Sequence, residues 1–559
     1  GDLVDEAQEF EPPDPPPLQP QPAAEVPDSA APEGAPDYPR LDLPAKVDGS
    51  FLFAGDVRLP DMAYASIRHG PVDRALLAEF DVAKAAGIRG VLDVVNGKRW
   101  LAAVADNWWS AEKALAAIDP LFTVARPASS SEIADAFDAA LRGGNARRLF
   151  ERGAGEVALA NHTLALRYDV APAVNFPLET ATATARIEGG RCELWIASQA
   201  PERARAAVAK ALGISAEDVV IYPMPAGGSF DRRLEHDHAI EAALIAREAG
   251  RPVQLVWSRA QEALAQYPRP PVSALMAART GPQGFLSAWT ARIAAPPAAR
   301  EFGRRLFANR TSWAAIDDVQ GEGDTLALEG AMPPYAIADV AVDHVPVSIS
   351  LPAGRMRGNA HGYTCFFTEC FMDELAAKHG REPLSYRMEL LGEDLRLAAC
   401  LQGAAQLAQW GSAPGQGLAC HRMGDVETGG RIALIALARF TEGGIEIDKM
   451  IASVDIGRIV NLDIARQQIE GGLIYGIALA SGAASSWSGG FPDKRRLAEL
   501  GIPRLANSPE IEVEFIASEE EPFDPGELGV AVAAPAIANA LFSATGVRIR
   551  RLPLLGGSL

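Results

Sequence analysis

Residues 192–259 decide the fold class of this chain, and they read CELWIASQAPERARAAVAKALGISAEDVVIYPMPAGGSFDRRLEHDHAIEAALIAREAGRPVQLVWSR. The segments CELWIAS, VVIYPMP and PVQLVWSR are short apolar runs typical of buried strands. A helical pattern starts at Pro201 and stops at Gly213, and a second one stops at Gly250. Because strands and helices alternate, the stretch predicts a layered α+β or α/β protein.

Composition narrows the class of protein further. The chain has 559 residues, 48% hydrophobic and 22% charged, which is typical of a globular protein with several domains. A net charge of -20 argues against nucleic-acid binding, which needs basic surfaces. No apolar run of about 18 residues is expected, so no membrane span is predicted. No metal-ligand set is predicted either, because none of the cysteines form a CxxC pair, and we expect free, mostly buried thiols at Cys192, Cys365, Cys370, Cys400 and Cys420.

Changes in composition and hydrophobic pattern along the chain divide it into four parts. Residues 1–40 are rich in proline and acidic side chains, which predicts an extended linker. Residues 41–126 predict a small α/β domain in which FLFAGDV and MAYASI are strands. Residues 127–402 and 403–559 predict two larger α+β domains, with 127–157 as a helical surface connection. The chain is expected to close with the helix PAIANALFSATG, with Pro535 in its first turn and Gly546 at its end.

Two features suggest chemistry. The turn AGGSFDRR (226–233) lies between a predicted strand and a predicted helix, where glycines let a ligand approach the backbone closely. The turn lacks both GxGxxG and GK[ST], so a nucleotide site is disfavoured. Near the other end, Glu527 stands alone before the apolar run LGVAVAAP. A carboxylate that is poorly hydrated gains proton affinity and becomes a better base, although most such glutamates are simply solvated.

Four stretches together resemble a known family. Residues 195–262, RMRGNAHGYTCFFTECFMDELAAKHGREPLSYRMELL (355–391), DIGRIVNLDIARQQIEGGLIYG (455–476) and the C-terminal GE…PAIANALFSATGVRIRRLPL resemble, in order, the large subunit of the molybdenum hydroxylases (the xanthine oxidase/aldehyde oxidase family). The branch they resemble is that of isoquinoline 1-oxidoreductase beta subunits and related aldehyde dehydrogenases. The resemblance implies a small α/β hammerhead domain at 41–126 followed by two molybdopterin-binding-type α+β domains.

The resemblance also implies roles for particular residues. Glu527 matches the base that takes a proton from the water-derived oxygen while an aldehyde or N-heteroaromatic carbon is hydroxylated. The protein supplies this base and a dry pocket, and the cofactor performs the redox step. The implied cofactor is molybdopterin, with molybdenum-cytosine dinucleotide as the expected form. The residues implied to hold it are Gly227, Gly228, Phe230, Asp231, Arg357, Gly358, Gln468 and Gly526.

The sequence departs from the family pattern at three places. The glycine-rich GGGFG of the family is GGSFD here, so Asp231 brings a side chain and a negative charge toward an anionic cofactor. If that position needs positive φ, the cost is about 1 kcal/mol or more. Met356 replaces a tryptophan, and an M-G-Q-G segment expected ahead of Leu41 does not occur. Two interpretations stay open: an active subunit completed by a partner chain, or a degenerate, cofactor-free member acting as a scaffold or binding protein.

The family pattern implies partners as well. A small [2Fe–2S] subunit and possibly a cytochrome c are expected to carry electrons, and a separate chain is expected to supply the N-terminal segment. The compartment stays open between bacterial periplasm and cytoplasm, and this chain alone is expected to be cofactor-free.

The residues themselves also allow plainer roles. Arg357 has an alternative role in pairing with an acid, and Gln468 an alternative as a helix-surface amide. His344, His361 and His421 are expected to be isolated, packed side chains.

Overall fold

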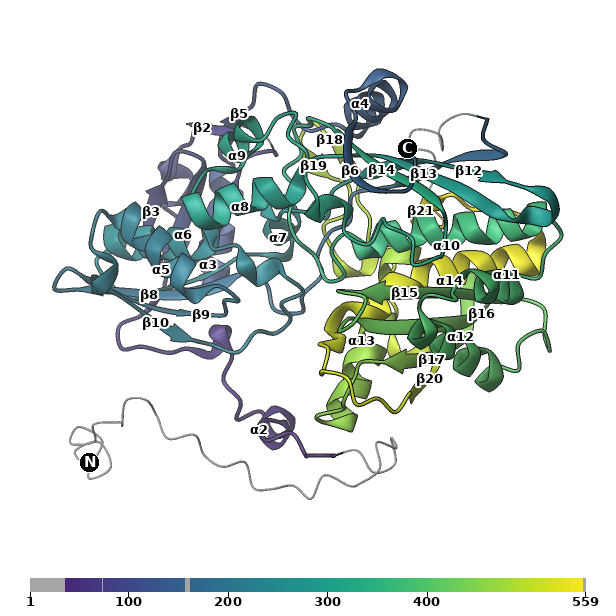
Figure 1. Cartoon of the computed structure of the whole chain (residues 1–559). Coiled ribbons are helices and arrows are strands. Elements are labelled where there is room, and N and C mark those ends of the chain that lie inside the picture. The colour runs from purple at the N-terminus through teal and green to yellow at the C-terminus, as the bar shows by residue number, and fades with distance from the viewer. Residues whose placement is uncertain (1–35, 73, 156–160, 556–559) are drawn as a thin grey trace.

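The structure, a computed structural model, describes residues 36–72, 74–155 and 161–555. Two lobes stand side by side (Figure 1). One is built on a seven-stranded mixed sheet, and the other holds a six-stranded and a four-stranded sheet with long helices between them. The mixed α and β composition predicted from the sequence is confirmed.

The seven-stranded sheet joins segments that are far apart in the chain. Its strand β1 runs parallel to β11 and antiparallel to β4, with Ala65 opposite both Leu255 and Val104. Strands from residues 41–126 therefore share one sheet with strands from residues 182–256, and the division of the chain into domains stays a prediction. The strands in spatial order are β10 (Val219–Pro223), β9 (Arg191–Ile196), β8 (Thr182–Glu188), β11 (Val253–Val256), β1 (Ala63–His69), β4 (Trp100–Ala105) and β3 (Val91–Asn96).

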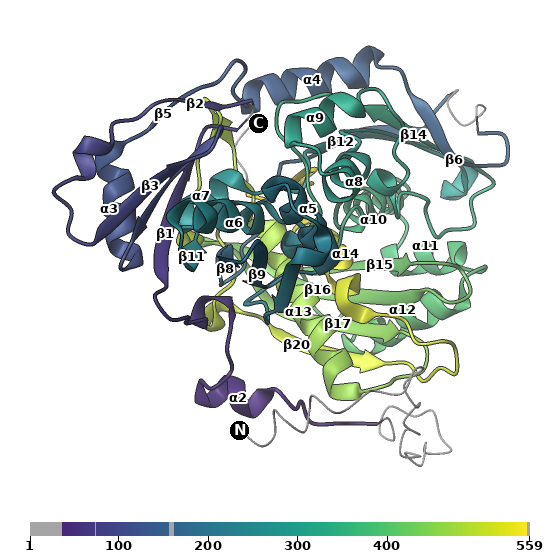
Figure 2. The same ribbon diagram turned by 90° about the vertical axis from the view of Figure 1, so that its left-hand side faces the viewer.

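Helices cover this sheet as the sequence pattern predicts. Helix α5 begins at Pro201 and ends at Gly213, which has φ 72°. Helix α6 ends in the same way at Gly250, with φ 61°. Left-handed glycine caps of this kind let the chain leave a helix without a Cβ clash. The helices of this lobe are α3 (Trp108–Ile118), α5 (Pro201–Leu212), α6 (Asp237–Ala249), α7 (Arg259–Ala265), α8 (Ala298–Ala308) and α9 (Ser312–Asp318), and Figure 2 shows α5, α6 and α7 from the side.

The six-stranded sheet corrects one prediction about residues 127–157. They form helix α4 (Ser130–Gly143), but then strand β6 (Arg147–Arg152), which pairs with β14 at the sheet edge rather than making a helical connection. Charged residues on an edge strand remain solvated, so their high content gives little strand signal. The strands in order are β21 (Arg551–Leu552), β7 (Leu164–Val170), β12 (Val272–Thr280), β13 (Leu286–Ala295), β14 (Asp339–Pro346) and β6.

A layer of long helices fills the space between the two sheets of the second lobe. Helix α10 (His361–Lys378) lies beside α14 (Leu528–Thr545), and α13 (Leu462–Ser481) flanks α14 as well (Figure 1). Helix α14 packs on the four-stranded sheet, while α11 (Pro383–Leu390) and α12 (Leu395–Leu407) complete the helices of this lobe. The strands of that sheet are β15 (Gln416–Met423), β16 (Gly430–Thr441), β17 (Gly444–Asp455) and β20 (Glu510–Phe515).

Helix α14 differs from its predicted bounds. It begins at Leu528, so Pro535 lies inside the helix and not in its first turn, while Gly546 ends it as expected with φ 73°. The prediction that no long apolar stretch exists is also wrong. The segment Pro525–Thr545 is long and apolar enough to cross a membrane, yet 78% of its most apolar window is buried inside the protein, as in the core helix of a globular domain.

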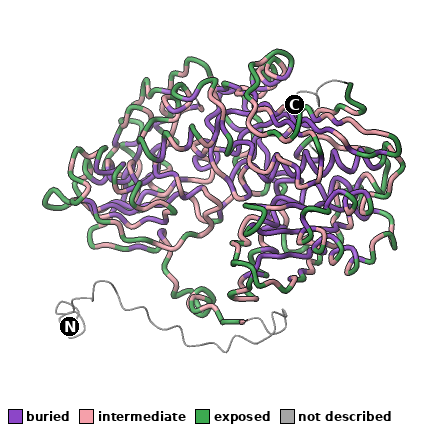
Figure 3. Tube along the Cα trace, in the orientation of Figure 1, coloured by how far each residue is buried: buried purple, intermediate pink, exposed green. Residues whose placement is uncertain are grey.

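Shorter elements complete the description. The predicted strand FLFAGDV contains the 3-10 turn Ala54–Asp56 instead, and helix α2 (Leu43–Asp48) before it has no buried residue (Figure 3). Two small sheets pair β2 (Leu76–Glu79) with β5 (Leu121–Thr123) and β18 (Trp487–Ser488) with β19 (Phe491–Pro492). The remaining 3-10 turns span Val82–Ala85, Ala216–Asp218, Arg232–Leu234, Pro282–Gly284, Leu326–Leu328, Leu497–Glu499, Leu505–Asn507 and Pro525–Glu527.

Residues 36–40, the described end of the predicted linker, have no helix or strand. They lie against the start of α13, where Asn461 Nδ2 donates to the Tyr38 carbonyl and the Leu462 amide donates to the Pro36 carbonyl. The rest of the predicted linker lies outside the described residues.

Candidate functional site

A cleft of about 1160 Å³ lies where the two lobes meet. The turn after β10, the loop before α10, the first turns of α13 and the segment before α14 all contribute to its walls. The predicted site residues that line it are Gly228, Phe230, Asp231, Arg357, Gln468, Gly526 and Glu527. Segments that are far apart in the sequence thus converge on one hollow.

The turn after β10 presents unused backbone donors to this cleft. The amides of Ser229, Phe230 and Asp231 donate no hydrogen bond within the part of the chain that the structure describes. Gly228 has φ 106°, and a Cβ there would come within 3.2 Å of Pro177. Free N–H groups in a row suit an anionic ligand without adding a formal positive charge. Gly227 is turned away from the cleft lining, and its amide donates to Glu179 Oε2 at 3.0 Å.

Arg357 forms hydrogen bonds with three segments that line the cleft. Its amide donates to the Phe230 carbonyl at 3.2 Å, its Nε to the Gly526 carbonyl at 2.8 Å and its Nη2 to the Gln468 carbonyl at 3.1 Å. It therefore pairs with backbone carbonyls, not with an acid as the alternative role supposed. The next residue, Gly358, lies outside the cleft lining, and with φ 89° it packs so closely on Val530 that a Cβ would approach to 2.5 Å.

Glu527 precedes α14 and is half-buried. Asn359 Nδ2 donates to its Oε2 at 2.8 Å, and its Oε1 accepts no hydrogen bond from the described residues. Burial and the negative charge of Asp231 raise the pKa of Glu527, while Arg355 and the Asn359 hydrogen bond act in the opposite direction. A carboxyl group with one oriented oxygen, one free oxygen and a raised pKa is suited to general-base chemistry.

Asp231 faces the same cleft from the other lobe. Its φ of 66° is left-handed, so the position does require the conformation that glycine adopts most easily. The carboxylate is held by Arg355 Nε at 3.4 Å and by Gln199 Nε2 at 3.2 Å. The charge expected from the sequence is thus present in the cleft, and a neighbouring arginine offsets part of it.

The sequence did not single out several residues that build the site. Asn359 and Arg355 flank the predicted arginine–glycine turn, and Asn359 is left-handed with φ 41°. Arg40 and Arg458 bring positive charge to the cleft, against Asp231, Asp524 and Glu527. Only the resemblance of the surrounding stretch pointed to this loop, because isolated arginines and asparagines carry no periodic signal. Gln468 lies exposed on α13, so both of its predicted roles remain compatible with its position.

Two histidines expected to be isolated form a pair. His361 Nδ1 and His421 Nε2 lie 2.8 Å apart, and both side chains are buried. Burial and the neighbouring His361 hold the pKa of His421 well below its usual value. His344 is buried and separate, and its Nδ1 accepts the Asp324 amide hydrogen bond. All five cysteines are free and buried, as predicted.

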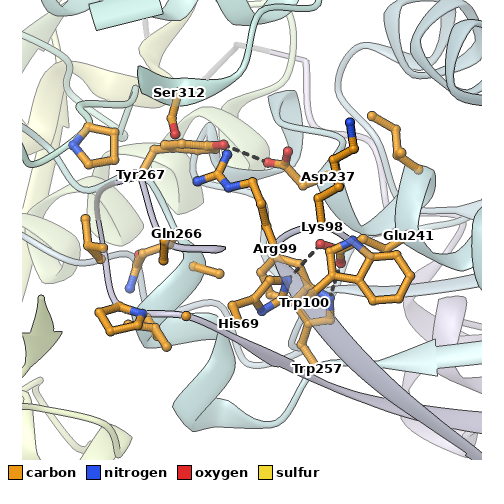
Figure 4. Close-up of a pocket in the computed structure, with 18 residues that line it drawn as sticks. His69, Lys98, Arg99, Trp100, Asp237, Glu241, Trp257, Gln266, Tyr267 and Ser312 are labelled. Carbon is orange, nitrogen blue, oxygen red and sulfur yellow. Dashed lines mark hydrogen bonds and ion pairs between the residues drawn. The ribbon is translucent and has the colours of Figure 1, made fainter. Parts of the chain in front are cut away.

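A second, smaller pocket of about 270 Å³ lies in the first lobe and contains none of the predicted site residues (Figure 4). The two acidic side chains of this pocket form hydrogen bonds with other side chains of the protein. His69 Nε2 lies 2.7 Å from Glu241 Oε1, Trp257 Nε1 donates to Glu241 Oε2 at 3.1 Å, and Tyr267 donates to Asp237 at 3.0 Å. Both acids therefore have protein partners without a ligand.

The lining of the cleft has features that bear on the binding of a molybdopterin group. Free backbone N–H groups and a glycine that leaves room for a ligand form a donor set that suits an anionic pterin. The carboxylates of Asp231, Asp524 and Glu527 in the cleft lining are unfavourable to an anionic group. In the described residues, no three side chains of His, Cys, Asp or Glu gather to hold a metal ion directly. The residues present fit a group that brings its own metal.

The fold and the cleft define a class of protein. Two segments match family models described as molybdopterin cofactor-binding domains, at residues 141–299 and 439–509. The aldehyde oxidoreductase from Desulfovibrio desulfuricans has the same fold, with a TM-score of 0.76 over 95% of this chain and 80% of that one, at 16% identity. The resemblance to molybdenum hydroxylase large subunits is confirmed.

Two relatives in sequence agree with the predicted branch. Isoquinoline 1-oxidoreductase subunit beta of Brevundimonas diminuta is 25% identical over 93% of this chain and 68% of its own length. A protein of Gluconacetobacter polyoxogenes named membrane-bound aldehyde dehydrogenase [pyrroloquinoline-quinone] is 26% identical over 92% of this chain and 70% of its own. The chain is a relative of these oxidoreductases, which is consistent with the prediction of an enzyme subunit.

Proposed function

We propose that the cleft is the cofactor-binding and catalytic centre of a molybdopterin-dependent oxidoreductase subunit that hydroxylates an aldehyde or an N-heteroaromatic carbon with oxygen derived from water. The observation that carries the proposal is the convergence of Glu527 and the free amides of Ser229, Phe230 and Asp231 on one hollow. The two relatives described above are named for an aldehyde and for an N-heteroaromatic substrate.

A bound molybdopterin would supply the two-electron redox chemistry. Residues 228–231 and Gly526 would contact it through backbone, and Gln468 through its amide. Arg357 would act mainly by holding these walls in place through its contacts with the carbonyls of Phe230, Gly526 and Gln468. We infer molybdenum-cytosine dinucleotide as the form of the cofactor from the branch of the family.

Glu527 is the residue we assign to proton transfer. Its Oε2 is fixed by Asn359, which leaves Oε1 to accept the proton of the attacking water-derived oxygen. Because burial and Asp231 raise its pKa, the carboxylate is a stronger base than a solvated glutamate. The neighbouring Asn359 orients the base and does not compete for the proton.

Electrons from this reaction have to leave through other subunits. From the branch of the family that the chain resembles, we infer a small [2Fe–2S] subunit as the acceptor, with a cytochrome c as a candidate for a further electron carrier.

The alternative is a cofactor-free relative that serves as a scaffold or binding protein. Asp231 favours it, because a carboxylate at a left-handed turn both strains the backbone and repels an anionic pterin. The retained Glu527 and the free amides beside it favour the enzyme.

Metal and pterin analysis of the chain, purified with its co-expressed partner subunits, decides between the two. We expect about one molybdenum and one pterin per chain, as the family stoichiometry for a single bound cofactor. Molybdenum well below one atom per chain with all partners present would contradict the enzyme and support the scaffold.

A further inference from the structure

Arg269 is a buried arginine without a counterion among the residues that the structure describes. It lies between α7 and β12 and is 3% exposed. Its Nη2 donates to the Ala171 carbonyl at 3.1 Å, while its Nε and Nη1 have no partner in the part of the chain that the structure describes. No acidic side chain of that part forms an ion pair with it. Buried guanidinium groups normally find an anion, because their desolvation is costly.

The described residues around Arg269 supply no negative charge. Burial lowers the pKa of Arg269 to about 10, so the side chain is still protonated at neutral pH. The phenols of Tyr363 and Tyr475 interact with it, but burial raises the pKa of both well above the ordinary value, so they stay neutral. The positive charge of Arg269 is therefore available to an anionic ligand.

A small cavity of about 30 Å³ adjoins Arg269. Arg355, Met356, Asn359 and Tyr363 are among the residues that line it. One ordered water needs only about 10–15 Å³ of such space, so the cavity has room for a few atoms, such as a carboxylate group. Two guanidinium groups on one small cavity favour an anion over a neutral group.

The cavity and the catalytic cleft share a wall. Asn359 lines the cavity and donates to Glu527 Oε2, and Arg355 lines the cavity and pairs with Asp231. A carboxylate anchored at Arg269 would therefore lie next to Asn359 and Arg355, the two residues that contact the acids of the cleft. This position fits a substrate and not the cofactor, whose proposed contacts are the amides on the cleft side.

We propose that Arg269 binds the carboxylate of the substrate, so that the enzyme acts on aldehydes or N-heteroaromatic rings that carry a carboxylate. The assignment rests on the proposed function and names its substrate class. Arg269 is a specificity-determining residue here, because it contacts the substrate at a distance from the reacting carbon. Met356 and Tyr363 give the cavity an apolar and aromatic lining beside the two cations.

Calorimetric titration with a charged and a neutral ligand of the same shape tests the proposal on the intact protein. We expect pyridine-3-carboxylate to bind at least about tenfold more tightly than pyridine-3-carboxamide, equivalent to about 1.4 kcal/mol. Arg269→Gln should abolish this preference. The control is Arg292→Gln, because Arg292 also donates from Nη2 to a single carbonyl, that of Gly144, and also has an unpartnered Nε. The control should keep the preference.

The same titrations give the results that would overturn the proposal. Equal affinities for the two ligands in the wild-type protein would do so, and so would a preference that survives in Arg269→Gln. Chloride that binds as tightly as the carboxylate would reduce the cavity to an inorganic anion site and overturn the substrate assignment. If Arg269→Gln does not fold by circular dichroism, Arg269→Lys keeps the charge but loses the planar fork, and undiminished affinity in that variant counts against the proposal.

Binding is measured here without turnover, so the result is separate from that of the proposed function. A chain that lacks molybdenum but distinguishes the carboxylate from the carboxamide keeps the Arg269 site and loses the oxidoreductase assignment. An active enzyme that contains molybdenum but binds both ligands equally keeps the oxidoreductase assignment and loses the Arg269 site.

Discussion

The cleft and the pocket of Figure 4 both contain carboxyl groups in poorly hydrated surroundings, but they differ in what faces those groups. In the pocket, Glu241 meets His69 and Trp257, and Asp237 meets Tyr267. In the cleft, Glu527 receives one hydrogen bond, from Asn359, and faces a second carboxylate, Asp231. A pocket whose polar groups are satisfied contributes stability, whereas a cleft that leaves donors and acids unsatisfied has capacity for a ligand.

The largest effect should follow from removing the proposed base. Glu527→Gln keeps the size of the side chain and its acceptor for Asn359 but cannot take a proton. We expect turnover of the assembled enzyme to fall by about 10²- to 10⁴-fold, the usual contribution of general-base catalysis. Steady-state kinetics with molybdenum content as the loading control measures this.

The exposed residue Glu521 offers the matched control, since Glu521→Gln removes a carboxylate just outside the cleft. It should leave turnover unchanged. Full activity in Glu527→Gln with the cofactor still bound would remove Glu527 from the role of base.

Substitutions in the pocket of Figure 4 should change the stability of the protein and not its catalytic activity. Glu241→Leu leaves both His69 and Trp257 without their acceptor, and breaking a buried pair in this way should cost about 3 kcal/mol of unfolding free energy. Glu241→Gln retains an acceptor oxygen and should lose much less. Urea unfolding of the two variants measures the difference, and equal losses in both would mean that the hydrogen bonds contribute little.

A smaller change concerns the pH dependence of the cleft. Glu527 has to be deprotonated to act, and its raised pKa places the loss of activity at a higher pH than for an ordinary glutamate as the solution is acidified. Asp231→Asn removes a negative charge that raises this pKa, so the acidic limb of the kcat/KM profile should move to lower pH. The exposed Asp463→Asn is the control and should not move it. A limb that stays in place in Asp231→Asn would mean that burial alone sets the pKa.

The smallest expected effect is on stability and reports the backbone conformation at residue 231 alone. Asp231 has φ 66°, so Asp231→Gly should be more stable than Asp231→Ala by about 1 kcal/mol. Both variants lose the contacts with Arg355 and Gln199, and their difference therefore reports the left-handed conformation alone. Equal midpoints in thermal unfolding would show that the turn relaxes when the side chain changes.

Much of the fold was predictable from local pattern. The strands and helices of residues 192–259 follow apolar periodicity and end at glycines with positive φ, because these signals act within a few residues. Helix α14 was harder to delimit. Its residues before Pro535 are apolar on every side, since they lie in the core between layers, and no amphipathic face marks their start.

Side-chain pairing was the least predictable feature. Helix α10 has the apolar residues expected of a core helix, such as Phe371 and Leu375, but it also buries Glu369, which pairs with Arg387 at 2.9 Å. The pair His361–His421 likewise joins residues that are far apart in the chain. Long-range partners of this kind have no signature in a single sequence, because neither member is unusual on its own.

The sequence by itself determined the layered strand–helix order, the family resemblance and the candidate residues Glu527, Asp231 and Arg357. Only the tertiary structure brought them to one cleft and showed that Arg357 binds carbonyls and that Asp231 is left-handed. It also showed that Arg269 has no counterion in the described part of the chain. The reason is physical. Local pattern records which residues prefer to be buried or to turn, whereas a proton affinity or an unsatisfied charge depends on every group that the fold places around it.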